Sequence, residues 1–162
     1  MRFLADGMLG KLTRWLRMLG CDVEYYNDLE DDKLIELAAK SGRTLLTRDQ
    51  ELFRKASTHG VEAFMITGAT ETEKLAEIAE RFHINLELNS DNSRCPRCNA
   101  KLNSVSKEKV LDRIPQSTSR FYNRFWVCPN CGKVYWQGSH WRKITRKLSE
   151  AKKLAELSSS SR

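Results

Sequence analysis

Cys95-Pro96-Arg97-Cys98 and Cys128-Pro129-Asn130-Cys131 form two Cys-x-x-Cys pairs, and these determine the architecture of the second half of this 162-residue chain. Two short turns that each present two thiolates can close a tetrahedron around one zinc ion. The intervening residues 99–127 leave room for a sizeable hairpin or a short helix. We therefore predict a zinc ribbon at residues 93–140, with Cys95, Cys98, Cys128 and Cys131 as the ligands of a structural Zn²⁺.

Two other interpretations of the cysteines, unrelated thiols and a disulfide framework, are less favoured. Disulfide frameworks belong to small secreted domains, whereas this chain is longer and its opening, MRFLADGML, contains no cleavable apolar run. No stretch approaches the roughly 18 apolar residues of a membrane span. We therefore expect a cytoplasmic protein that does not associate with membranes, in which the fifth cysteine, Cys21, is a small core residue.

The charges of the chain are divided unevenly. Residues 1–94 contain 13 Lys and Arg against 17 Asp and Glu, a net charge of −4, whereas residues 95–162 contain 15 against 4, a net charge of +11. A strongly basic surface attracts polyanions because binding releases their counterions. The simpler alternative is a basic surface that only keeps the protein soluble. The uneven division favours nucleic acid as the partner of the second half.

Strand-like and helical patterns alternate through the first 90 residues. This alternation is typical of βαβ units and predicts an α/β domain with a mostly parallel sheet flanked by helices. Thr70-x-x-Glu73 has the pattern of a capping box, which marks a helix start, and residues 89–93 have the composition of a linker. The predicted strands are 2–5, 21–26, 43–47 and 61–67, and the predicted helices are 8–19, 31–40, 50–57 and a segment after Thr70.

The first predicted helix has one apolar and one basic side. Helical spacing places four residues on one stripe that should face the core. A second set, on the other side, should face solvent. The inward set is Met8, Leu12, Trp15 and Leu19, and the outward set is Lys11, Arg14 and Arg17.

Acidic residues follow three successive predicted strands. Asp6 comes after the first strand, Asp31 and Asp32 belong to a cluster after the second, and Asp49 follows the third. The carboxyl ends of parallel strands lie at one edge of the sheet, where ligands bind in such folds. Carboxylates gathered there favour Mg²⁺ or Mn²⁺, and paired ions of this kind promote phosphodiester hydrolysis. Alternatively, each acid caps the helix that follows it.

Several motifs resemble one known family along nearly the whole chain. The opening is Phe3-Leu4-Ala5-Asp6-Gly7-Met8-Leu9-Gly10-Lys11-Leu12 followed by Trp15-Leu16-Arg17-Met18-Leu19-Gly20. Further matches are Asp31-Asp32-Lys33-Leu34, Leu45-Leu46-Thr47-Arg48-Asp49, Ser93 to Asn99, Cys128 to Trp136, and Gly138-Ser139-His140-Trp141. In combination they resemble the Mut-seven C-terminal ribonuclease domain family.

This resemblance implies a PIN-like nuclease fold with an appended zinc ribbon, and metal-dependent cleavage of RNA. It implies that Asp6, Asp31 and Asp49 are the catalytic acids that hold Mg²⁺ or Mn²⁺, with Asp32 as the alternative to its neighbour. PIN nucleases generally use a fourth acid late in the domain. The nearby options, Glu71 and Glu73, fit a helix start better.

Aromatic and basic residues alternate around the second cysteine pair. This mixture suits single-stranded RNA, whose bases stack on rings while cations contact the phosphates. Alternatively, the aromatic residues cover the small core of the ribbon, and we assign Trp126 and Tyr135 to that structural role. The predicted nucleic-acid contacts are Lys11, Arg14, Arg48, Trp136, His140, Trp141, Arg142 and Lys143.

The sequence therefore predicts a PIN-like domain at residues 1–92, the zinc ribbon at 93–140, a basic helix at 141–157 with one apolar stripe, and a disordered tail at 158–162. The predicted activity is hydrolysis of RNA, such as structured rRNA or tRNA, alone or on the ribosome. A non-catalytic RNA- or ribosome-binding adaptor is the alternative from another class. A toxin-like nuclease restrained by a partner is a third hypothesis. The stripe of the C-terminal helix comprises Ile144, Leu148 and Ala151.

Overall fold

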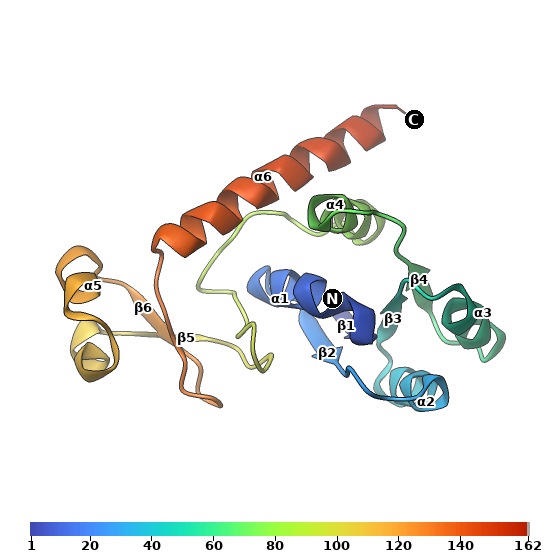
Figure 1. Ribbon diagram of the computed structural model, residues 1–162, viewed down its shortest axis with the longest axis horizontal. Coiled ribbons are helices and arrows are strands. Elements are labelled where there is room, and N and C mark those ends of the chain that lie inside the picture. Colours follow the sequence, from blue (N-terminus) through green and yellow to red (C-terminus); the bar gives the residue numbers. More distant parts are fainter. Residues whose placement is uncertain (162) are drawn as a thin grey trace.

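A four-stranded parallel sheet forms the centre of the computed structural model, which describes residues 1–161 (Figure 1). The strand order is β2-β1-β3-β4, and Phe3 pairs with Val23 on one side and with Thr44 on the other. The inner strands are buried on both faces, which explains why they are short apolar runs. The predicted α/β class with a mostly parallel sheet is confirmed. The strands are β1 (Arg2–Ala5), β2 (Asp22–Tyr25), β3 (Thr44–Thr47) and β4 (Ala63–Met65).

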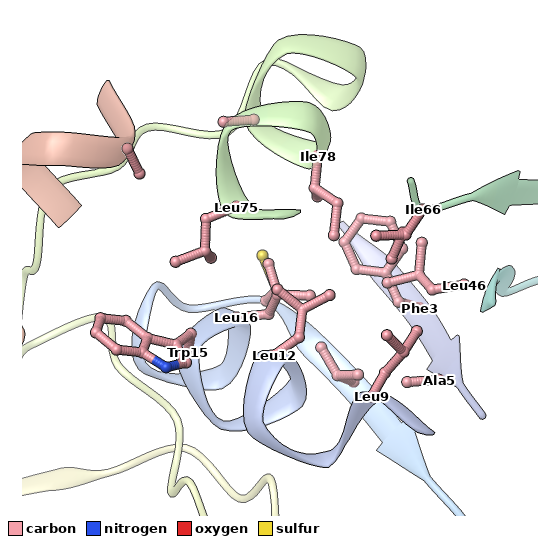
Figure 2. Close-up of a cluster of buried hydrophobic side chains, with 14 of the residues drawn as sticks. Phe3, Ala5, Leu9, Leu12, Trp15, Leu16, Leu46, Ile66, Leu75 and Ile78 are labelled. Carbon is pink, nitrogen blue, oxygen red and sulfur yellow. The ribbon is translucent and has the colours of Figure 1, made fainter. Parts of the chain in front are cut away.

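Helices pack on both faces of this sheet. On one face α1 (Gly10–Met18) and α4 (Glu71–Phe82) form a core with Phe3 and Leu46, which Figure 2 shows in close-up. On the other face α2 (Asp31–Ser41) and α3 (Gln50–Thr58) pack against Leu4 and Leu45. Neighbouring side chains of one strand thus pack into the cores on opposite faces of the sheet, as the alternation of side chains along a strand requires.

The zinc-ribbon segment forms a separate antiparallel sheet. It consists of β5 (Asn103–Val105), β6 (Phe125–Val127) and β7 (Val134–Tyr135), in that order. The connection between β5 and β6 contains two 3₁₀ turns, Lys107–Lys109 and Leu111–Arg113, and the short helix α5 (Gln116–Phe121). Its core is small and centres on Val110, Phe125 and Val134.

The first cysteine turn docks on the edge of the parallel sheet. The side chain of Asn99 accepts a hydrogen bond from the backbone N–H of Val23 at 3.0 Å and donates one to Asp22 at 2.7 Å. Asn99 has φ of 73°, a left-handed conformation that asparagine tolerates better than most residues. Arg17 of α1 donates to the carbonyl of Pro96 at 3.0 Å. The ribbon is therefore joined to β2 and α1 by side-chain hydrogen bonds.

The C-terminal helix α6 (Ser139–Ser160) returns to the α/β domain and lies along α4 (Figure 1). Its predicted apolar stripe is confirmed, because Ile144, Leu148 and Ala151 are buried in the same core as α1 and α4. The helix begins two residues before the predicted start and continues past the predicted end. The expected disordered tail is therefore wrong for residues 158–160, and residue 162 lies outside the described residues. No helix within residues 1–161 is long and apolar enough to cross a membrane.

Two predictions for the first helix are wrong. Met8 is 68 % exposed rather than inward, because residues Gly7–Leu9 form a 3₁₀ turn whose tighter winding gives the inward position to Leu9. Arg17, expected on the outer side, is buried. Its guanidinium donates to the carbonyl of Val23 at 3.0 Å as well as to Pro96, so the ribbon and β2 cover a position that would otherwise face solvent.

Candidate functional site

Asp6 lies at the centre of the carboxyl edge of the parallel sheet. It follows β1 directly, is only 6 % exposed, and its backbone N–H bonds to the carbonyl of Leu46. One carboxylate oxygen accepts from the N–H of Met8 at 3.0 Å, so Asp6 does cap the following 3₁₀ turn. The other accepts a hydrogen bond from the hydroxyl of Thr47. These bonds fix the orientation of the carboxylate.

Asp49 caps the next helix along the edge. Its Oδ1 accepts from the N–H groups of Glu51 at 2.8 Å and Leu52 at 3.2 Å, at the start of α3. Its own N–H donates to the Thr47 hydroxyl at 2.9 Å. Thr47 is completely buried and thus connects two predicted acids. Sequence reasoning missed it, although its place as the last residue of a strand, directly before Arg48-Asp49, was the available signal.

Asp31 is the third acid that faces this edge. It lies in the first turn of α2, and the preceding residue, Glu30, occupies the cap position. The prediction that Asp31 or Asp32 caps this helix is therefore wrong. Partial burial, followed by the negative charges of Asp49 and Asp6, raises the pKa of the Asp31 carboxyl. Its neighbour Asp32 instead forms an ion pair with Lys55 of α3 at 2.7 Å. The structure thus separates the two adjacent acids: Asp31 lies in the field of Asp6 and Asp49, and Asp32 is paired elsewhere.

Among the residues that the structure describes, the three acids do not form a compact group of potential metal ligands as the four cysteines do. Within residues 1–161, the only three or more potential ligand atoms that lie within 4.8 Å of one another belong to the cysteines. Mg²⁺ typically retains several waters and binds through one or two carboxylates, so wider spacing is compatible with it. The carboxylate of Asp31 forms no hydrogen bond or ion pair with another described residue. Its raised pKa results first from burial and then from the neighbouring acids, and the positive charge of Lys55 offsets this only in part.

Glutamates near the end of β4 stabilise the neighbouring loop. Glu73 forms the predicted capping box with Thr70, and Glu71 forms an ion pair with Lys74 at 2.8 Å. Glu77 of α4 accepts from the N–H groups of Thr67 and Gly68, at 3.1 Å to each. Arg48, a predicted phosphate contact, donates to the carbonyl of Gly68. Glu77 and Arg48 therefore hold the loop at Thr67 and Gly68 in place, whereas Glu71 and Glu73 act at the start of α4.

The four cysteines form a second site. Their sulfur atoms lie within 4.8 Å of one another, with 3.6 Å between Cys95 and Cys131 and 3.3 Å between Cys98 and Cys128. Four Zn–S bonds of about 2.3 Å in a tetrahedron place the sulfurs about 3.8 Å apart. None of the four is in a disulfide. The donor set and its spacing fit the predicted Zn²⁺.

Neighbouring side chains favour the thiolate at Cys95 and Cys98, whereas burial raises the pKa of the Cys128 thiol. The Tyr135 hydroxyl lies 3.1 Å from the sulfur of Cys95, and burial, followed by that hydrogen bond, raises the pKa of Tyr135, so that the phenol stays protonated and donates. A hydrogen bond from Asn130 lowers the pKa of the Cys98 thiol. The Arg17 guanidinium adds a positive charge close to Cys95 and Cys98. Such outer contacts orient metal ligands.

The predicted nucleic-acid contacts fall into two groups. Trp136, His140 and Trp141 line one cleft together with Arg14 of α1. The remaining predicted contacts lie outside that lining: Lys11 is exposed on α1, Arg48 bonds to Gly68, and Arg142 and Lys143 are exposed on α6. Trp126, predicted to be structural, is buried, and Tyr135 supports the cysteine site.

The fold and the two sites define a class of protein: an α/β domain with acids at the carboxyl edge of its parallel sheet and an appended four-cysteine metal-binding module. A family model, the Mut7-C RNAse domain, matches residues 1–148 of the 162. The chain belongs to this family, which confirms the predicted resemblance and indicates a ribonuclease-like function. No curated protein and no solved structure matches the chain.

Proposed function

We propose that this protein is a metal-dependent ribonuclease that hydrolyses RNA phosphodiester bonds at the edge formed by Asp6, Asp31 and Asp49. The observation that carries the proposal is the environment of the Asp31 carboxylate. It has no hydrogen-bonding partner among the described residues, and it lies in the negative field of the other two acids. Charges arranged in this way favour binding of a cation. Membership of the RNAse domain family supports RNA as the substrate.

The three acids would hold Mg²⁺ or Mn²⁺, which would supply positive charge to the phosphate and promote ionisation of a water molecule. The residues of the chain orient the ligands. Thr47 donates to Asp6, and the N-terminus of α3 holds one oxygen of Asp49. The basic second half, with its net charge of +11, would attract the RNA.

The direct test is cleavage of end-labelled single-stranded and structured RNA with Mg²⁺ or Mn²⁺. Adjacent acids provide a matched comparison. Asp31→Asn should reduce the rate at least about 100-fold, whereas Asp32→Asn, which removes the partner of Lys55, should retain most activity. Thr47→Val should reduce the rate about 10- to 100-fold through Asp6, and Thr47→Ser should not. Full activity of Asp31→Asn and Asp6→Asn would refute the proposal.

An RNA- or ribosome-binding adaptor is the second candidate. The engagement of Glu73 in the capping box favours it, because this carboxylate is not free to act as the fourth acid of a PIN nuclease. Glu71 pairs with Lys74 through one oxygen only, and its other, buried oxygen has no hydrogen-bond partner among the described residues. An adaptor predicts no cleavage by any variant, and RNA binding that weakens steeply with salt but does not depend on Mg²⁺ or on Asp6 and Asp49.

A further inference from the structure

A cleft of about 750 Å³ lies between the α/β domain and the ribbon. Its walls come from α1, from the segment around residues 88–97, and from residues 133–144, which lead from the ribbon into α6. The cleft exists because the ribbon docks on β2 through Asn99 while α6 returns to α4. Gln137 donates to Ser90 at 3.3 Å and joins two of these walls.

The charged side chains that line the cleft are all basic. They are Arg14, Arg94, Arg97 and Lys133, with His140 beside them, and among the described residues no Asp or Glu lines the cleft. Arg94 is already committed to the carbonyl of Asn99 at 2.9 Å. The side chains of Arg14, Arg97 and Lys133 form no hydrogen bond or ion pair within residues 1–161, so their charges are available to an anionic ligand.

Two partly exposed tryptophans complete the lining, Trp136 and Trp141. Trp136 is fixed in place, since its ring packs on Phe125 at 6.2 Å between centroids and a Cβ atom at Gly138 would lie 2.9 Å from its indole nitrogen. A third tryptophan of the lining, Trp126, is buried, and its indole N–H donates to Asp91 at 3.1 Å. The cleft therefore offers pre-arranged aromatic surface beside unpaired cations.

We propose that this cleft binds unpaired nucleotides of the RNA. Their bases stack on Trp136 and Trp141, and their phosphates contact Arg14, Arg97 and Lys133. Base faces are accessible only in single strands, loops and bulges, whereas the bases of a duplex are stacked on one another. This inference rests on the proposed function, because it takes RNA as the substrate, and it narrows the substrate to RNA that contains a single-stranded segment.

The test measures binding rather than cleavage. The zinc-loaded full-length protein carrying Asp49→Asn, without added Mg²⁺ or Mn²⁺, is titrated into a fluorescently labelled 12-nucleotide single strand and into the blunt duplex of the same sequence. The single strand should bind more tightly. Trp141→Ala should weaken its binding about 5- to 150-fold, and Trp141→Phe should retain most of the affinity. Lys133→Ala should reduce the slope of log K against log salt by about 0.7.

Matched controls lie outside the cleft. Phe121→Ala removes an exposed aromatic ring from α5, and Lys40→Ala removes one cation from the end of α2. Neither should change the preference for the single strand. Equal binding of single strand and duplex, or unchanged affinity in Trp141→Ala, would overturn the inference. Polyglutamate that displaces the labelled strand as effectively as unlabelled RNA does would also overturn it.

The two proposals can fail separately. If the cleft variants lose binding while the wild type cleaves no RNA, the cleft inference stands and the ribonuclease proposal fails. If the wild type cleaves RNA and Trp141→Ala binds the single strand normally, the cleft inference fails and the ribonuclease proposal stands.

Discussion

Asp31 carries a negative charge that the fold compensates only in part. Burial and the charges of Asp49 and Asp6 raise its pKa, although Lys55 partly opposes this, and Asp32 contributes a further negative charge. A raised pKa in the folded state means that the carboxyl stabilises the fold only while it is protonated, and that this contribution is lost as the pH rises through that pKa. At pH 7, without a divalent cation, the ionised Asp31 therefore destabilises the protein.

The raised pKa of Asp31 gives a prediction that needs no activity assay. At pH 7 and without Mg²⁺, Asp31→Asn should unfold at a higher temperature than the wild type. Mg²⁺ at ten times its dissociation constant should stabilise the wild type by about 1.4 kcal/mol, a rise of about 3–6 °C for a chain of this size, and should leave Asp31→Asn unchanged. The measurement is calorimetry of both proteins with and without Mg²⁺.

Asp32→Asn is the control for this experiment. Asp32 lies one residue away from Asp31 but pairs with Lys55. Asp32→Asn should therefore keep the response to Mg²⁺ and show no increase in melting temperature. A response to Mg²⁺ that survives in Asp31→Asn would place the cation elsewhere.

Local sequence signals identified these acids but not what orients them. Asp6 and Asp49 followed predicted strands, and the structure shows each of them both at the edge of the sheet and as a helix cap, so the two interpretations are compatible. The distinction between Asp31 and Asp32 was not predictable, because it depends on Lys55, which belongs to another helix. Thr47 was missed because its role requires Asp6, 41 residues away.

Helix α1 connects the two halves of the chain through Arg17. Its guanidinium is buried and donates to the carbonyls of Val23 and Pro96, the latter 79 residues away. Periodicity placed Arg17 on the outer side because a pattern along one helix contains no information about a later segment that covers it. By contrast, the capping box of α4 was predicted correctly, since Thr70 and Glu73 lie three residues apart and determine the helix start themselves.

Replacing Arg17 should loosen the docking of the ribbon. Arg17→Met keeps much of the apolar side chain but leaves two carbonyls without their donor, and should lower the free energy of unfolding by about 2–4 kcal/mol. Arg14→Met, on the exposed side of the same helix, is the matched control and should change it by less than about 0.5 kcal/mol. Urea denaturation measures both. Equal stability of the two variants would show that Arg17 does not join the ribbon to α1.

The molecule as a whole has hydrophobic cores of unequal size. Two large apolar clusters cover the two faces of the parallel sheet, and α6 contributes to one of them. The ribbon has only a small cluster around Val110, Phe125 and Val134. Small domains with little core commonly depend on a metal for stability. The position of the domain boundary near residue 92 stays a prediction, because Asn99 and α6 connect the two parts on either side of it.

Loss of zinc should therefore unfold the ribbon and leave the parallel sheet folded. The purified protein should contain about one Zn per chain. In Cys98→Ser, amide hydrogens of β5, β6 and β7 should exchange rapidly, while those of β1 and β3 stay protected. The remaining domain should be less stable by about 1–3 kcal/mol, because Val23 and Asp22 lose their bonds to Asn99. Cys21→Ser, at a cysteine buried in the first half and outside the cluster, should retain zinc. If β1 and β3 lost protection together with the ribbon in Cys98→Ser, the chain would be a single cooperative unit and the boundary near residue 92 would be wrong.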